Sequence, residues 1–217
     1  MLAVAAIMAT MSASAQFEPG KWSIDINIGL GASWLNKSEE MILNGYELDK
    51  QVAPSALIGL GASYQVNQLL GLSAGVNWAV QGQGWDDLRL GDVKYNNNSL
   101  ELTYVQIPVM AHVYFYKGWS VNAGIQPSFL VNADQTCNIK NTSGERTVKT
   151  DTRIDYMDDM KKFDLSIPLG ISYEFKGHFV LGAQYNLGLS TVNKKTLSNK
   201  DMKNGAILLT LGWRTSL

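Results

Sequence analysis

Large apolar residues alternate with small or polar residues along most of the chain. Between positions 22 and 34, every even position carries Trp, Ile, Leu or Ala, whereas every odd position carries Ser, Asp, Asn or Gly. This period of two is the pattern of a β-strand whose two faces meet different surroundings. Further copies run over about 55–66, 70–81, 100–116, 119–131, 163–175, 178–190 and 205–216. The sequence therefore predicts eight strands and no helix.

The connections between these strands alternate in length. Three are predicted as two-residue turns: Asn67-Gln68, Lys117-Gly118 and Lys176-Gly177. Glycine at the second position supplies the positive φ that such turns require. The other four are predicted as long surface loops, at about 35–54, 82–99, 132–162 and 191–204. Short periplasmic turns, long surface loops and an even strand number are typical of outer-membrane barrels, with both termini on the periplasmic side.

The chemistry of the two faces distinguishes a membrane barrel from a water-soluble one. A soluble, lipocalin-like barrel that binds a ligand has its large apolar residues inside. Here the second face consists mainly of Gly, Ser, Asn and Gln, which suits the narrow interior of an eight-stranded barrel. We therefore expect an all-β, eight-stranded, up-and-down antiparallel transmembrane β-barrel. A soluble ligand-binding barrel is an alternative, and it requires the apolar face to point inward.

Aromatic residues collect near both ends of the predicted strands. Near the short turns they are Trp22, Tyr64, Trp119, Tyr173, Phe179 and Trp213, and near the long connections they are Trp34, Trp78, Tyr104, Phe129 and Phe163. Two aromatic girdles are what the two interfaces of a bilayer favour. They support the membrane interpretation.

The N-terminal segment is apolar and built from small residues. Met1 to Ala15 ends in Ala13-Ser14-Ala15, which resembles the cleavage site of a secretory signal peptide. We therefore expect a signal peptide over 1–15 and a barrel over 16–217, located in the bacterial outer membrane.

Composition excludes several other classes of protein. The chain is 46% hydrophobic and 17% charged, which excludes a disordered protein. Its single cysteine excludes a disulfide scaffold and a cysteine-ligated zinc site. A net charge of −1 argues against nucleic acid as a partner. Beyond the N-terminal segment there is no apolar run near 18 residues, which excludes a bundle of membrane-spanning helices.

Two features interrupt the strand pattern. Leu100 and Leu102 are apolar at even positions, whereas the apolar positions from Val105 onward are odd. This change of phase near Tyr104 predicts a β-bulge. Three prolines inside strands each remove a backbone donor, and we interpret them as bulge or bend sites. They are Pro108, Pro127 and Pro168.

The motifs of hydrolytic enzymes do not lead to a predicted active site. Ser73 lies in a G-x-S-x-G sequence, but the nucleophile elbow of hydrolases needs a strand–turn–helix context, and here the motif lies inside a strand. His112 and His178 are both expected at the periplasmic end, so neither serves a surface-facing site. Glu101 and Asp164 near the outer rim are the only candidates for a carboxylate base. We predict no catalytic, cofactor-binding or metal-binding residue.

A small set of ionisable residues is predicted to face the lumen. The set is Asp25, Glu101, Asp164, Glu174 and Arg214. The first and last strands must meet when the barrel closes, so we expect Arg214 to pair with Asp25, with Glu174 as a second partner. Charges in a narrow lumen need such partners, and side chains fill the interior of an eight-stranded barrel. The role is structural, and a substrate pore is not expected.

The third long connection, at 132–162, carries equal numbers of acidic and basic residues. They are Asp134, Glu145, Asp151, Asp155, Asp158 and Asp159 against Lys140, Arg146, Lys149, Arg153, Lys161 and Lys162. Such a segment is a solvated loop or a surface for partner contact. The acids lack the spacing of a calcium loop, and Cys137 is interpreted as incidental.

Two segments of the chain are near copies of each other. Val105-Gln106-Ile107-Pro108-Val109 and Leu165-Ser166-Ile167-Pro168-Leu169 each lead to a Lys-Gly pair and then to a Gly-x-Gln step. This unit resembles the PorT-like outer-membrane β-barrel family of Bacteroidota, in which a Tyr-x-x-Ile-Pro phrase, here Tyr104 to Pro108, precedes a tight turn. The resemblance implies the fold and the location. The namesake of the family takes part in type IX secretion and gliding, whereas most relatives have no assigned activity.

The sequence favours a non-enzymatic structural or interaction module of the cell envelope, with a role accessory to a secretion or surface complex as one form. The expected partners are the outer-membrane bilayer and an envelope protein that contacts the surface loops or the periplasmic turns, without nucleic acid or cofactor. The first alternative is a small surface-facing enzyme that acts on lipid or peptide, and it needs acids that converge at the outer rim.

Overall fold

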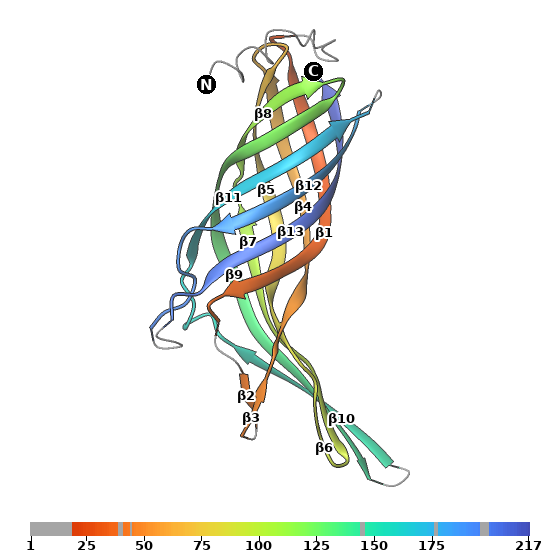
Figure 1. Ribbon diagram of the computed structural model, residues 1–217, viewed down its shortest axis with the longest axis vertical. Coiled ribbons are helices and arrows are strands. Elements are labelled where there is room, and N and C mark those ends of the chain that lie inside the picture. The colour runs from red at the N-terminus through yellow and green to blue at the C-terminus, as the bar shows by residue number, and fades with distance from the viewer. Residues whose placement is uncertain (1–18, 39–40, 44, 144–145, 176–177, 196–199) are drawn as a thin grey trace.

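The computed structural model describes residues 19–217 apart from 39–40, 44, 144–145, 176–177 and 196–199 (Figure 1). The predicted signal peptide and the predicted turn at Lys176-Gly177 lie outside the described residues. Within them, no helix is long and apolar enough to cross a membrane.

A closed sheet forms the body of the molecule. In the described part of the chain its strands are β1 (Trp22–Asn36), β4 (Lys50–Gln65), β5 (Leu70–Trp85), β7 (Val93–Gln106), β8 (Val109–Tyr116), β9 (Trp119–Ser143), β11 (Phe163–Glu174), β12 (Phe179–Gly188) and β13 (Lys203–Ser216). Strands β7 and β8 follow each other in one position of the wall, so the barrel has eight staves. Each stave pairs with its neighbour in antiparallel fashion, and β13 pairs with β1 to close the ring. The predicted fold class is confirmed.

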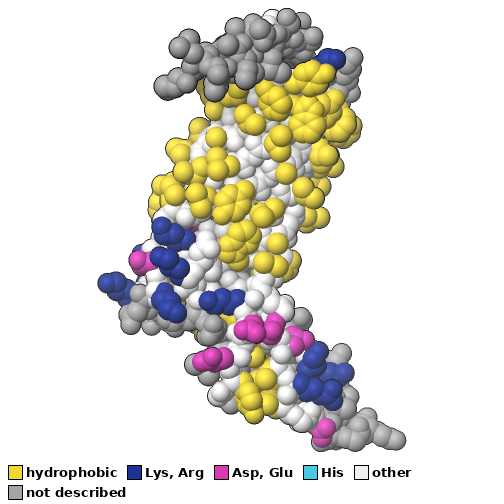
Figure 2. Space-filling model, viewed as in Figure 1, with side chains coloured by type: hydrophobic (Ala, Val, Ile, Leu, Met, Phe, Trp, Pro, Cys, Tyr) yellow, Lys and Arg dark blue, Asp and Glu magenta, His cyan; other side chains and the backbone are white. Residues whose placement is uncertain are grey.

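A belt of apolar side chains surrounds the barrel (Figure 2). Leu30, Leu60 and Leu209 are 68%, 62% and 66% exposed, whereas Ser33, Ser55 and Asn77 on the other face are buried. The apolar face therefore points outward, which contradicts the soluble, ligand-binding alternative. The aromatic residues predicted for the two girdles contribute to the belt with one exception, since Tyr104 points inward and is 0% exposed.

Two of the connections expected as loops contain long paired strands. β9 runs for 25 residues and pairs with β10 (Arg146–Asp155), while β7 pairs with β6 (Leu88–Leu90). These segments extend beyond the belt, at the end opposite the chain termini (Figure 1). We call this sheet the arm. It consists of β6 and β10 together with the parts of β7 and β9 that pair with them, at 93–95 and 134–143. A short hairpin of β2 (Met41–Leu43) and β3 (Tyr46–Leu48) lies at the same end.

The arm strands lack the alternation that marks the barrel strands. A strand of the barrel contacts lipid on one side and the packed lumen on the other, so its residues alternate. Both faces of the distal arm meet water, and polar residues occur at odd and even positions alike. The sequence pattern therefore identifies the barrel strands but not the arm strands.

The predicted bulge near Tyr104 is present, but its extra residue belongs to β9. Thr103 pairs with Asn132 and Tyr104 pairs with Leu130, which leaves Val131 unpaired in this ladder. The even positions of β7 from Asn98 to Gln106 consequently face inward, including Leu102, which is 0% exposed. The apolar residues of β7 move from even to odd positions because part of the lumen is apolar. The side chains of the strand do not change face.

Pro108 and Pro168 interrupt pairing without shifting it. The register between β5 and the β7–β8 stave is the same on both sides of Pro108, whose carbonyl accepts the Gly75 N–H at 3.1 Å. The register between β11 and β9 is likewise unchanged across Pro168. A further register shift lies in β4 between Val52 and Ala56, around Pro54. The register therefore shows no bulge at Pro108 or Pro168, while the stave is interrupted at Pro108, between the end of β7 at Gln106 and the start of β8 at Val109.

The two described short turns differ from each other. Lys117 and Gly118 both have positive φ, at 32° and 90°, as the two-residue turn predicts. The turn at Asn67-Gln68 is longer than predicted, because β4 ends at Gln65 and β5 begins at Leu70. The Asn67 side chain supports it by accepting the Leu69 and Leu70 N–H groups at 2.8 and 2.9 Å.

Candidate functional site

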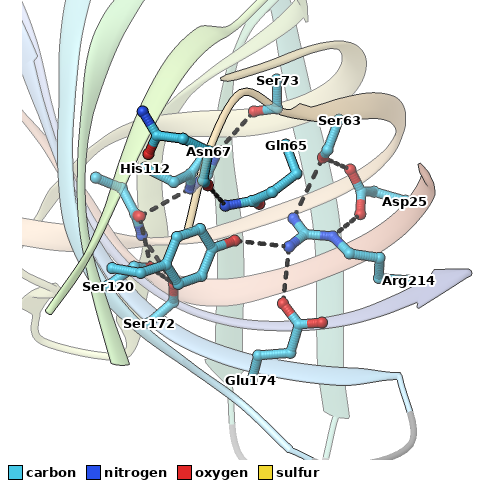
Figure 3. A network of polar contacts seen from close by, with 12 residues as sticks. Asp25, Ser63, Gln65, Asn67, Ser73, His112, Ser120, Ser172, Glu174 and Arg214 are labelled. Atoms are coloured by element: carbon cyan, nitrogen blue, oxygen red, sulfur yellow. Dashed lines mark hydrogen bonds and ion pairs between the residues drawn. The ribbon is translucent and has the colours of Figure 1, made fainter. Parts of the chain in front are cut away.

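Arg214 is the centre of a polar network in the lumen near the short-turn end (Figure 3). Its Nε donates to Asp25 Oδ1 at 2.5 Å, and its Nη1 donates to Glu174 Oε2 at 2.8 Å. Two hydroxyl oxygens complete the shell, since Tyr114 accepts at 3.1 Å and Ser63 at 3.3 Å. The predicted pairing of Arg214 with Asp25 and Glu174 is confirmed.

Barrel closure brings these charges together. Asp25 on β1 lies directly opposite Arg214 on β13 in the closing ladder, and Glu174 ends β11, two staves from β13. The three side chains are only 12%, 17% and 8% exposed for Arg214, Asp25 and Glu174. Buried charges are tolerated when they are paired and hydrogen-bonded. The network thus ties both ends of the barrel chain to β11.

A second set of hydrogen bonds connects a serine, a histidine and an asparagine on neighbouring strands. Ser73 Oγ lies 2.7 Å from His112 Nε2, and His112 Nδ1 lies 2.8 Å from Asn122 Oδ1. Asn122 donates its amide N–H to Ser172 Oγ at 2.9 Å, so its Oδ1 is the acceptor. His112 therefore carries its proton on Nδ1, and Nε2 accepts from Ser73.

This order of groups is that of a nucleophile, a base and an orienting amide. Acyl transfer also needs free donors for the developing oxyanion. β5 is paired on both sides at Ser73, with β4 and with β8, so its backbone N–H groups are used in the ladders. Arg214 already has four acceptors. Neither the β5 backbone at Ser73 nor Arg214 therefore offers an oxyanion hole, and the relay links three strands.

The sequence placed Ser73 in the lumen correctly but missed its contact with His112. The contact is diagonal, because His112 lies opposite Gly71 and not opposite Ser73. Inward positions on adjacent strands could have suggested it, but the offset depends on the length of the intervening segment. His178 lies beside the short turn at a φ of 96°, with its ring 5.9 Å from that of Trp213.

A cavity of about 150 Å³ lies in the lumen beside the two networks. Its lining includes Asp25, His112 and Arg214 together with the amide residues Asn77 and Gln184. The cavity is polar enough to hold water.

Apolar side chains fill the lumen toward the arm end. The packed residues, each at most 5% exposed, are Leu35, Leu100, Leu102, Tyr104, Leu130, Ala133, Met160, Val192 and Met202. Met160 and Val192 come from the connections after β10 and β12, and an isolated bridge joins Met160 to Asn193. We call this cluster the cap. Beneath it, Asn204 donates to Tyr104 Oη at 3.1 Å and to Asp164 Oδ2 at 2.7 Å.

The two acids proposed for the outer rim do not converge. Asp164 is 1% exposed and accepts hydrogen bonds from Asn204 and from Ser190 inside the lumen. Glu101 is exposed on the outer face, opposite Gly82 and Asp134. The expectation that Glu101 faces inward is wrong, because β7 keeps its even positions inside. The wall separates the two carboxylates, so they form no acid–base pair.

The arm holds an ion pair between Arg153 on β10, whose side chain is 63% exposed, and Asp134 on β9, whose side chain is 10% exposed. The hydrogen bond from the Arg153 guanidinium, with a further one from Asn132, lowers the pKa of the Asp134 carboxyl. Burial raises the pKa of the Cys137 thiol, which makes it a weak nucleophile. Among the described residues, no group of three or more His, Cys, Asp or Glu side chains could hold a metal ion.

Comparison with known proteins identifies the family. The family model "Outer membrane protein beta-barrel domain" matches residues 14–193. No curated protein sequence matches the chain.

Several solved structures are similar to the whole chain at low identity. Ail, the attachment invasion locus protein of Yersinia pestis, is 17% identical with a TM-score of 0.45, covering 91% of this chain and 100% of that chain. Neisserial surface protein A is 11% identical with a TM-score of 0.42, covering 88% and 96%. The outer membrane protein AlkL is 11% identical with a TM-score of 0.47, covering 94% of each chain. The match to the family model covers most of the sequence, and the chain belongs to the outer-membrane β-barrel domain family.

Proposed function

We propose that the protein is a non-enzymatic interaction module of the outer membrane, in which the barrel is the anchor and the arm contacts a partner on the cell surface. One observation carries the proposal. Strands β7 and β9 leave the barrel wall without a break and continue beyond the apolar belt as part of a four-stranded sheet. A rigid sheet held on a fixed anchor is a suitable platform for recognition.

The filled lumen supports this role over transport. The cap occupies the arm end of the lumen, and the Arg214 network occupies the short-turn end. The separation of Glu101 from Asp164 and the lack of an oxyanion hole in the β5 backbone at Ser73 support a role without catalysis. The arm is then the part of the molecule that can carry the function, through contact with a partner.

The orientation of the barrel and the kind of partner are proposed from the sequence. Export through cleavage after Ala15 places the short turns in the periplasm and the arm outside the cell. The resemblance to PorT-like barrels favours a partner that belongs to an envelope complex, such as one for secretion or for the cell surface.

The test is the native mass of the protein extracted from its own outer membrane in mild detergent. In the arm-shortened variant, Asn-Gly turns replace residues 86–97 and 138–151, because the flanking positions 85 and 98, and 137 and 152, are paired. The matched control replaces residues 41–48, the β2–β3 hairpin, in the same way. We expect a large complex for the natural protein and the control, and a solitary barrel for the arm-shortened variant. A solitary natural protein, or a complex that survives without the arm, would contradict the proposal.

A further inference from the structure

Basic residues form one row across the whole arm. Lys94 on β7 lies directly opposite Arg89 on β6 and opposite Lys140 on β9. Lys140 in turn lies opposite position 149 of β10, which is also a lysine. Directly opposite residues share a face of the sheet. We call this set the basic row, and Figure 2 shows Lys and Arg side chains gathered on the distal part of the molecule.

The basic row carries a cost within the sheet. Like charges directly opposite each other in neighbouring strands destabilise the pairing. Lys94 contacts Asp87 at 3.0 Å, and Arg89 Nε donates only to the Gly91 carbonyl of its own turn. Among the described residues, neither Arg89 nor Lys140 has an ion-pair partner, and both are exposed. Asp87 therefore offsets the charge of Lys94, whereas the described part of the arm gives Arg89 and Lys140 no such ion pair.

An acidic row lies between the basic row and the barrel. Asp134 on β9 is directly opposite Glu101 on β7 and Asp155 on β10. Six residues along β9 separate Asp134 from Lys140, which corresponds to roughly 20 Å. This separation exceeds the Debye length of about 8 Å at physiological salt. Glu101, Asp134 and Asp155 therefore do not neutralise the basic row. An anionic lipid surface at the barrel would lie closer to these three acids than to the basic row.

We propose that the basic row binds a linear anionic polysaccharide that lies across the arm strands. Neighbouring strands are about 4.8 Å apart, so the described side chains of the row, Arg89, Lys94 and Lys140, form a straight line of charge about 10 Å long. A compact anion reaches only part of such a line, whereas a polymer with repeated sulfate or carboxylate groups reaches all of it. The next row toward the barrel consists of Asn96, Asn138 and Asp151, so amides that can bond sugar hydroxyls occupy two of its three positions. This inference rests on the proposed role of the arm and names its partner.

The test measures binding of the full-length protein, in neutral lipid nanodiscs, to immobilised dextran sulfate. The row variant carries Arg89→Gln, Lys94→Gln and Lys140→Gln. The matched control carries Lys161→Gln, Lys162→Gln and Lys195→Gln, three exposed lysines outside the row, so both variants lose the same charge. We expect the row variant to bind about tenfold more weakly, since exposed ionic contacts contribute modestly each. The control should stay within about twofold of the natural protein on the same reasoning, and binding should weaken as salt rises.

Four results would overturn the inference. They are no binding to dextran sulfate, equal binding to neutral dextran, equal losses in the two variants, and row-dependent binding to phosphatidylglycerol vesicles as tight as that to dextran sulfate. The last result would assign the row to a lipid surface. The native mass separates this inference from the proposed function. A complex that survives arm shortening rejects the proposed function, whereas a row variant that keeps its affinity for dextran sulfate rejects the polysaccharide site alone.

Discussion

Arg214 allows two carboxylates to remain charged inside a narrow barrel. The substitution Arg214→Met keeps much of the side-chain volume but leaves Asp25 and Glu174 without their common partner. Because an unpaired buried charge is costly, we expect a loss of about 3–5 kcal/mol in the free energy of unfolding. Urea unfolding in lipid vesicles, followed by tryptophan fluorescence, measures the change.

The ion pair of the arm, in which the arginine is 63% exposed, provides the control for this prediction. Arg153→Met removes the partner of Asp134, but Asp134 can then bind water and still accepts from Asn132. We expect a much smaller effect on unfolding than for Arg214→Met. Equal effects of the two substitutions would mean that the lumen network contributes no more to the free energy of unfolding than the ion pair of the arm.

The residues of the lumen were predictable to the extent that they depend on strand closure and period two. Arg214 and Asp25 lie opposite each other because the first and last strands must meet. The contact of Ser73 with His112 was not predictable, since it depends on an offset between strands that the turns set. Glu101 was misplaced because the extra residue of the bulge lies in β9, which the sequence of β7 does not reveal.

Among the elements, the arm is predicted to trade stability for binding. Lys140 lies between two other basic positions in its row. Lys140→Thr removes this repulsion and introduces a residue that favours strands, so we expect the arm to become more stable by about 0.2–1 kcal/mol. Hydrogen exchange of the arm amides is the measurement, and exchange should slow.

Lys162→Thr serves as the comparison for this change, because Lys162 is exposed but lies outside the arm strands. It should leave arm exchange unaltered. Faster exchange in Lys140→Thr would mean that the basic row stabilises the sheet, so that no external anion is needed to explain it.

The elements of the barrel could be identified from sequence because lipid and lumen select different residues on the two faces of each strand. The elements of the arm could not, since water surrounds both faces of its distal part. The outer third of the lumen also departs from the polar pattern, because the cap is built from leucine, methionine and tyrosine. In the sequence of β7, these apolar lumen residues gave the same pattern as a strand whose side chains change face.

At the scale of the whole molecule, two separate fillings close the barrel. The cap is apolar and the Arg214 network is charged, with the cavity of about 150 Å³ near the charged end. We expect the purified protein to produce no stepwise ion conductance in a planar bilayer, since neither end offers an open path. Conductance steps that survive in the arm-shortened variant would show that the lumen opens, and would favour transport.

The order of charge along the arm gives it an electric dipole. Its negative pole, formed by Glu101, Asp134 and Asp155, lies close to the barrel, and its positive pole lies at the row through Lys94 and Lys140. The negative potential of a membrane with anionic lipids fades within a Debye length, so it repels the near pole and hardly reaches the far one. The bilayer that anchors the protein therefore opposes contact with the acidic end of the arm, while the basic end lies beyond the reach of the membrane's field.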